Sequence, residues 1–334
     1  MIRRARLTDI ALIRKMADNA ACLDCESLHV QGSQGTKNII GATLGLSDSA
    51  TTVVWCAEGG VQATAFAQFI KARPGESARV TCLGPCQDGF WPDYAISMLE
   101  GLVIEAGFAG LKSITAEVNE SEGGFVSLRK AGFVVYIRQS VYSSTDIRWK
   151  TNTRDNSNVV VAKSQTEDKS EIYKLYNSIV PDLAKQAEET PSDKEVSYVV
   201  RNKDAMVGMF NVRNGPIGVW IKPYFYPEAG NEVGEVLANY VLSTIHLHKK
   251  PAYVRVRSYQ PWLGGLLKDA GFNLISTQAV MARRTTARVG VHEIDPIAKL
   301  VVSDADASIP VSKTINQDCL LSKQNERSFE TRNL

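Results

Sequence analysis

The cysteines are the residues in this sequence whose spacing most readily suggests chemistry. Cys22 and Cys25 form a C-x-x-C pair, and Cys82 and Cys86 form a second, wider pair. Two such pairs can supply the four thiolates of a structural zinc site. The second pair, however, falls near the end of an expected strand, and six cysteines in 334 residues do not form a disulfide framework. We therefore expect reduced, partly buried thiols and no metal site.

Composition and charge exclude several classes of protein. The 44% hydrophobic and 22% charged residues are typical of a globular protein, and the net charge of +2 gives no basic field for nucleic acid. No apolar run approaches the roughly 18 residues that span a bilayer. The sequence also lacks the G-x-S-x-G, H-E-x-x-H and P-loop patterns. We expect a cytoplasmic protein that binds neither nucleic acid nor a membrane.

A helix ending, a glycine and a strand occur in the same order twice. Residues 127–142 contain L-R-K-A-G-F followed by a β-branched and aromatic run, and residues 266–281 contain L-K-D-A-G-F followed by a similar run. The glycine is expected to form a left-handed helix cap, and the phenylalanine to pack back onto the last turn. Gln139 of the first copy matches Gln278 of the second. Because the helices upstream also align, a domain-sized repeat is favoured over a chance match of a common helix ending.

The repeat predicts two halves with one order of elements. The expected strands are residues 2–6, 52–56, 61–71, 77–83, 111–118 and 134–142 in the first half, and 158–162, 196–201, 206–213, 217–224, 253–257 and 273–281 in the second. Residues 21–50 allow either a second helix or a loop. We predict domains at 1–144 and 157–284, a linker at 145–156 and a largely disordered tail at 285–334. The two halves are expected to pack as a pseudo-dimer.

This element order, with its L-x-x-A-G-F endings, resembles the GNAT N-acetyltransferase superfamily. The resemblance covers both halves, 1–144 and 157–284. It implies an α/β (α+β) fold of two tandem acyl-CoA acyltransferase domains, each a mixed, mostly antiparallel sheet flanked by helices. It further implies that the third meander strand and the next strand splay apart, with acetyl-CoA between them. The pyrophosphate would then meet the N-terminus of the following helix, where backbone N–H groups favour anions.

Carried over by position, the resemblance places the cofactor against seven residues. These are Cys82, Leu83, Gly84 and Gly89 in the first half, and Ile221, Lys222 and Gly230 in the second. The phosphate-loop pattern of the family, Q/R-x-x-G-x-G/A, is absent from both halves, and acidic residues such as Asp88 and Glu232 stand near both helix starts. Acidic residues there stabilise the helix but repel a pyrophosphate.

The catalytic acid of many family members is also missing. The tyrosine that protonates the thiolate, four residues before the glycine, is replaced by Leu128 and Leu267. Glu117, Asn119 and Tyr259 lie on or just after the splayed strands and are the candidates to substitute. Two functions remain open. One is acetyl transfer from acetyl-CoA to a small-molecule or peptide amine by direct attack; the other is a catalytically inactive small-molecule binder or protein-interaction scaffold.

Overall fold

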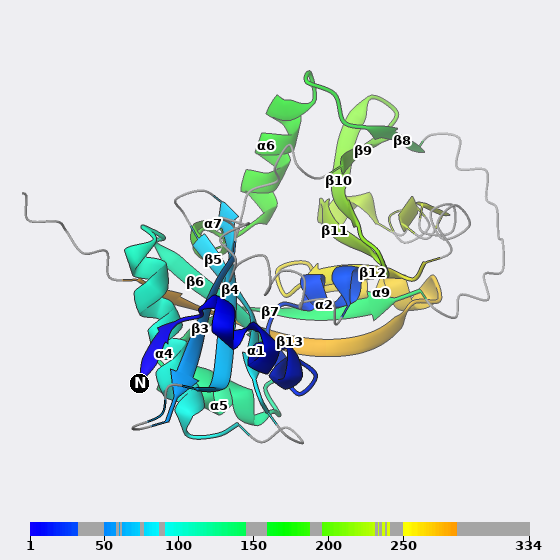
Figure 1. Cartoon of the computed structure of the whole chain (residues 1–334). Helices are drawn as coiled ribbons and strands as arrows, with labels where there is room; N and C mark the ends of the chain where they lie inside the picture. The colour runs from blue at the N-terminus through cyan, green and yellow to red at the C-terminus, as the bar shows by residue number, and fades with distance from the viewer. Residues whose placement is uncertain are drawn as a thin grey trace, which may run out of the picture. The chain divides into compact units, whose positions relative to one another are not determined.

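The computed structural model describes most of the first 285 residues. The described residues are 1–32, 50–57, 60, 62–73, 77–86, 91–144, 159–187, 196–230, 233, 236–237, 239–240 and 250–285. They all belong to one compact unit, residues 1–288, and the second unit, 289–334, lies outside them (Figure 1). The predicted linker and all but the first residue of the predicted tail also lie outside them, so the domain boundaries stay a prediction. Within the described residues, no helix is long and apolar enough to cross a membrane.

All predicted strands of the first half are present, with ends that differ by at most two residues. The elements are β1 Ile2–Arg4, the short 3-10 helix η1 Leu7–Asp9, α1 Ile10–Ala17, β2 Ala21–Cys22, α2 Cys25–Gln31, β3 Ala50–Cys56, β4 Ala63–Arg73, β5 Ser77–Gly84, α4 Tyr94–Phe108, β6 Ser113–Val118, α5 Gly123–Lys130 and β7 Val134–Ser143. The stretch left open between helix and loop forms β2 and α2 in its described part. Asp24 caps α2, because its Oδ1 accepts from the Ser27 N–H at 3.4 Å.

The second half repeats this order. Its elements are β8 Val159–Lys163, α6 Lys169–Ile179, α7 Asp182–Ala187, β9 Val196–Asn202, β10 Ala205–Asn214, β11 Val219–Phe225, η2 Pro227–Ala229, β12 Ala252–Arg257, α9 Trp262–Asp269 and β13 Asn273–Arg284. Helix α7 was not predicted. Val233, Leu237 and Tyr240 are helical, as expected for a helix after β11.

The two A-G-F endings have the predicted cap geometry. Gly132 and Gly271 have φ values of 78° and 89°, which a residue with a Cβ rarely adopts. The N–H of Phe133 donates to the carbonyl of Leu128 at 3.0 Å, and the matching N–H in the second half makes the same bond at 2.8 Å. Both phenylalanines are buried. In each half, the glycine therefore turns the chain so that the following strand begins against the helix that precedes it.

The described strands form one sheet that runs through both halves. Its order is β1-β3-β4-β5-β6-β13-β7-β12-β11-β10-β9-β8, and β2 pairs with β5. Strand β13, the last of the second half, lies between β6 and β7 of the first half, and β7 lies between β13 and β12. Both β13–β7 and β12–β7 are antiparallel, and β7 and β13 run alongside each other in Figure 1. Each half thus places its last strand next to the other half's penultimate strand.

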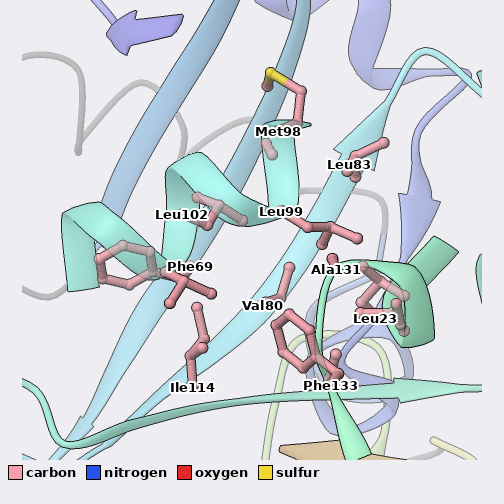
Figure 2. Close-up of a cluster of buried hydrophobic side chains, with 14 of the residues drawn as sticks. Leu23, Phe69, Val80, Leu83, Met98, Leu99, Leu102, Ile114, Ala131 and Phe133 are labelled. Carbon is pink, nitrogen blue, oxygen red and sulfur yellow. The ribbon is translucent and has the colours of Figure 1, made fainter. Parts of the chain in front are cut away.

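The large apolar clusters lie on the α4 and α9 side of the sheet. In the first half, Leu99 and Leu102 of α4 pack with Phe69, Val80 and Ile114 of the strands, as Figure 2 shows. In the second half, residues of α9 pack with alternate residues of β11 and β12. Because side chains alternate along a strand, the residues between them, among them several arginines, face the other side of the sheet. We call this the polar face; it carries α2, and it also carries α6 and α7 over a smaller apolar cluster that includes Tyr224 and Val280.

Candidate functional site

Two openings in the sheet form the candidate site. Strands β5 and β6 are parallel and pair only at Ser77–Arg79 with Ser113–Thr115. Strands β11 and β12 are also parallel and pair only at Val219–Ile221 with Ala252–Val254. Each pair diverges beyond these residues, and divergence leaves backbone N–H and C=O groups that need other partners.

The first opening is bridged by the backbone of Leu23. Its N–H donates to the carbonyl of Thr81 on β5 at 2.9 Å, and its carbonyl accepts from the N–H of Glu117 on β6 at 2.8 Å. Arg79 pairs with Thr115, so Thr81 and Glu117 are the next positions that would pair if the strands had stayed together. Residue 23 therefore lies between β5 and β6 as a short inserted strand would.

Side chains hold this inserted segment in place. Leu23 is 2% exposed and belongs to the apolar cluster with Leu83 and Phe133 (Figure 2). The next residues turn to the polar face, where the N–H of Cys25 donates to the carboxylate of Glu117 at 2.8 Å. The first opening is thus occupied by the chain itself, on both of its hydrogen-bonding edges.

The first-half residues predicted to meet a cofactor contact this segment instead. Cys82 and Leu83 pair with β2. A Cβ on Gly84 would lie 2.8 Å from the Cβ of Ala20, so the space that glycine provides is used by the incoming chain. Gly89 lies outside the described residues. Their role in cofactor binding stays a prediction.

The second opening is spanned by one side-chain amide. The carboxamide of Gln260 accepts from the N–H of Phe225 at 2.9 Å and donates to the carbonyl of Pro223 at 3.1 Å. Both backbone groups lie on the β11 edge that faces the opening. Gln260 is only 2% exposed, and it is held between β12 and α9, just before Pro261. In contrast to the first opening, no backbone segment pairs with this edge among the described residues.

The second-half residues predicted to meet a cofactor lie around this opening. Ile221 is fully buried and is the last β11 residue that pairs with β12. The Nζ of Lys222 lies 3.0 Å from the carboxylate of Glu26, so its side chain turns to the polar face. Gly230 follows η2 with φ of 61°, where a side chain would be strained. Among the residues that the structure describes, no inserted strand pairs beside these positions.

A carboxylate from the first half joins cations from both halves on the polar face. Glu26 of α2 lies 2.7 Å from Arg213 Nη1, 3.0 Å from Lys222 Nζ and 3.3 Å from Arg79 Nη1. The residue is 4% exposed. Burial raises the pKa of this carboxyl, but Lys222, Arg79 and Arg213 outweigh burial and hold the pKa well below its usual value. Glu26 is therefore ionised at neutral pH.

Glu117, a predicted catalytic candidate, has the opposite electrostatic environment. Burial raises its pKa, although Arg257 of β12 lies 3.9 Å away and favours the charged form. Arg257 also donates to Gln139 Oε1 at 2.8 Å. Because its carboxylate accepts from the Cys25 N–H, Glu117 holds the start of α2. The described contacts show that Glu117 positions the segment that fills the first opening.

The other two catalytic candidates, Asn119 and Tyr259, make contacts of their own. Asn119 Oδ1 accepts from both the N–H and the hydroxyl of Ser121, which makes it the first residue of a turn. Tyr259 packs against an apolar cluster that includes Tyr224. A catalytic role for these three residues stays a prediction.

The cysteines of the two sequence pairs meet across one pair of strands. Cys22 and Cys82 lie opposite each other on β2 and β5, and burial raises the pKa of both thiols to about 12. Both remain thiols at neutral pH. Among the described residues, no three metal-ligating side chains form a group.

Sequence reasoning missed Glu26 and Gln260, the two side chains that define the site. Glu26 follows a helix cap, where an acidic residue needs no further explanation. Gln260 is one polar residue before a proline and a helix. Their importance comes from partners on distant strands, and no local pattern reports those partners.

Comparison with known proteins identifies the fold. No family model matches the chain, and no curated protein matches it. A GCN5-related N-acetyltransferase from Sphaerobacter thermophilus superposes with a TM-score of 0.51 and 13% identity, covering 85% of this chain and 95% of that one. A tandem GNAT protein from the clavulanic acid biosynthesis pathway superposes with a TM-score of 0.50 and 10% identity, covering 85% of this chain and 98% of that one. The fold is a tandem GNAT fold.

The predicted resemblance and fold class are therefore confirmed. Both halves of this chain carry the mostly antiparallel sheet with flanking helices that the sequence implied. At 10–13% identity the likeness concerns the fold, so activity has to be argued from the site.

Proposed function

We propose that this protein is an acyl-CoA-dependent N-acyltransferase whose acyl-CoA binds in the second half, between β11 and β12. The observation that carries the proposal is the pair of hydrogen bonds between the Gln260 carboxamide and the edge of β11 beyond its pairing with β12. A hydrogen-bonded amide already occupies this edge, so the edge accepts an amide group. The pantetheine arm of acyl-CoA contains secondary amides that present the same donor and acceptor.

The residues of the second opening suit this ligand. Phe225 N–H and Pro223 C=O would hold an amide of the arm once the Gln260 side chain has turned away. When bound, acetyl-CoA supplies the thioester that an amine can attack. Because α9 and its apolar cluster cover one face of the sheet here, we place the amine on the other face, beside Lys222 and next to the part that α6 covers at Tyr224.

Tyr224 is the residue that we assign to proton transfer. It lies between Pro223 and Phe225 on β11, and its hydroxyl accepts from Arg255 Nη2 of β12 at 3.3 Å. A tyrosine at this edge can give a proton to a leaving thiolate, the role that the leucines of the L-x-x-A-G-F endings cannot fill. The first half, whose opening Leu23 bridges, then serves as the scaffold that holds α2 against the second half.

The alternative is a protein without transferase activity. It is favoured by one observation, namely that both openings are filled by the chain itself, the first by a backbone segment and the second by Gln260. In that case the tandem GNAT fold would act as a binder of small molecules or as an interaction scaffold.

Calorimetric titration of the full chain with acetyl-CoA tests the proposal. We expect one site per chain, and we expect Gln260→Ala to bind about tenfold more tightly, because the variant removes an internal competitor that makes two hydrogen bonds. The matched control is Gln68→Ala, which removes a buried glutamine hydrogen-bonded to Thr52 on the first-half sheet. That control should leave the affinity unchanged. If neither the native chain nor Gln260→Ala binds acetyl-CoA at millimolar concentration, the transferase proposal fails and the scaffold remains.

A further inference from the structure

Three cationic side chains from three strands converge on one carboxylate of the polar face. Arg79 of β5, Arg213 of β10 and Lys222 of β11 all lie within 3.3 Å of Glu26. Arg79 also lies 3.7 Å from Asp24. Arginine and lysine donors arranged in this way are the usual means by which proteins bind carboxylates and phosphates. Glu26 shows that the arrangement holds a carboxylate.

The cluster is open to solvent on one side. Glu26 is buried, but the side chain of Arg213 is 34% exposed and that of Arg79 is 25% exposed. The guanidinium of Arg213 carries five N–H donors, more than Glu26 alone can accept. An anion from solution can therefore reach the same cations without displacing Glu26.

An unused hydrogen-bond donor lies beside the cluster. Asn211 of β10 is 1% exposed; its Oδ1 accepts from Ser197, but its Nδ2 has no hydrogen-bond partner. Asn211 is directly opposite Lys222 in the β10–β11 pair, so both side chains lie on the polar face. Leaving a buried N–H unbonded costs free energy, which an acceptor atom of a ligand would recover.

We propose that this cluster is a binding site for an anionic group, a carboxylate or a phosphate, carried by the amine acceptor. The proposal rests on the proposed function, because it assigns the acceptor of that reaction. Lys222 directly precedes Pro223, whose carbonyl lines the second opening, so an anion bound by Lys222 and Arg213 places its amine on the face from which the thioester is reached. The acceptor is thus an amine that bears a negative charge.

Anion binding can be measured without acetyl-CoA. We expect saturable calorimetric binding of either succinate or inorganic phosphate to the full chain, and the stronger of the two identifies the anionic group. Arg213→Gln should weaken it about tenfold, since a charged hydrogen bond is lost. Asn211→Asp, which is nearly isosteric and retains the acceptor for Ser197, should abolish it by placing a carboxylate at the site. Arg201→Gln is the matched control, because Arg201 also joins two carboxylates, Asp168 and Glu171, but lies away from the cluster.

The same variants separate this inference from the proposed function. Arg213→Gln and Asn211→Asp should bind acetyl-CoA as the native chain does, and their circular dichroism and unfolding midpoints verify that they fold. With acetyl-CoA present, release of CoA thiol should be faster with L-glutamate or phosphoethanolamine than with uncharged amines of similar size, and Arg213→Gln should remove this preference. If acetyl-CoA binds but neither anion does, the anion site is wrong and the transferase stands. If an anion binds but acetyl-CoA does not, the proposed reaction is wrong and the site remains.

Discussion

Gln139 Nε2 donates to Gln278 Oε1 at 2.7 Å, and these two residues are the equivalent positions of the two sequence repeats. They face each other directly in the antiparallel β7–β13 pair. Equivalent residues meet in this way at the axis of an isologous interface. We therefore propose that the halves pack as the pseudo-dimer expected from the repeat, with its axis at this glutamine pair.

The pair is nevertheless asymmetric, which predicts unequal mutant effects. Gln139 also accepts from Arg257 Nη1, so Gln139→Ala removes two hydrogen bonds and Gln278→Ala removes one of those described. We expect losses in the free energy of unfolding of about 2–3 kcal/mol for Gln139→Ala and about 1 kcal/mol for Gln278→Ala. Urea unfolding of both variants and of the double variant measures this. Equal losses would contradict the assigned network.

Glu26→Gln tests the ion cluster that joins the halves. Removing the charge from a buried carboxylate with three cations should cost about 3–5 kcal/mol at neutral pH. Because the folded pKa of Glu26 lies below the ordinary value of 4.5, its contribution is complete above that value and is lost as the pH falls through the folded pKa. The difference in unfolding free energy between the native chain and the variant should therefore narrow below about pH 4.5. A difference that does not depend on pH would show that the charge is not responsible.

Glu117→Gln should behave in the opposite way. Burial raises the folded pKa of Glu117, so its ionisation in the folded state costs free energy once the pH exceeds the ordinary value of 4.5. The glutamine retains an acceptor for the Cys25 N–H without the charge. We expect the variant to equal or exceed the native stability at neutral pH, and this advantage to shrink as the pH falls. The test is to measure the free energy of unfolding of the native chain and of the variant from acid to neutral pH. A large loss of stability in the variant at pH 7 would show that the fold needs the charge of Glu117.

The sequence alone predicts the elements of this fold better than their partners. The strands and the glycine caps follow from local signals, such as the period-2 runs and the A-G-F endings, because each depends on neighbouring residues. The exchange of β7 and β13 between the halves cannot be predicted from local signals. The two strands have similar residue patterns, so either one could pair with the same edge strand. The bridge at Leu23 is equally hidden: its hydrogen bonds are backbone bonds, which any residue can make, and the stretch that contains it allowed either a helix or a loop. Gln260 and Glu26 depend on residues 35 and 187 positions away, respectively.

Gly218 tests how closely α2 lies against the second half. A Cβ at this residue would overlap the carbonyl oxygen of His29 at the end of α2. Gly218→Ala should therefore push α2 from β11 and lower the free energy of unfolding by about 1–3 kcal/mol. Gly265→Ala is the control, because Gly265 lies in α9 with no atom within 4 Å of the new Cβ, and it should stabilise by about 0.5–1 kcal/mol. Thermal unfolding compares the two, and a neutral Gly218→Ala would mean that α2 is not held there.

Hydrogen–deuterium exchange of the full chain with and without acetyl-CoA tests most directly that the second opening is the acyl-CoA site. The account predicts that acetyl-CoA slows exchange of the Phe225 amide and its β11 neighbours, because the ligand replaces the Gln260 side chain with a bound partner. Exchange at Leu23, which already bridges the first opening, should not change. Slower exchange at Leu23 or at the facing residues of β5 and β6, with Phe225 unaffected, would contradict the account and assign the ligand to the first half.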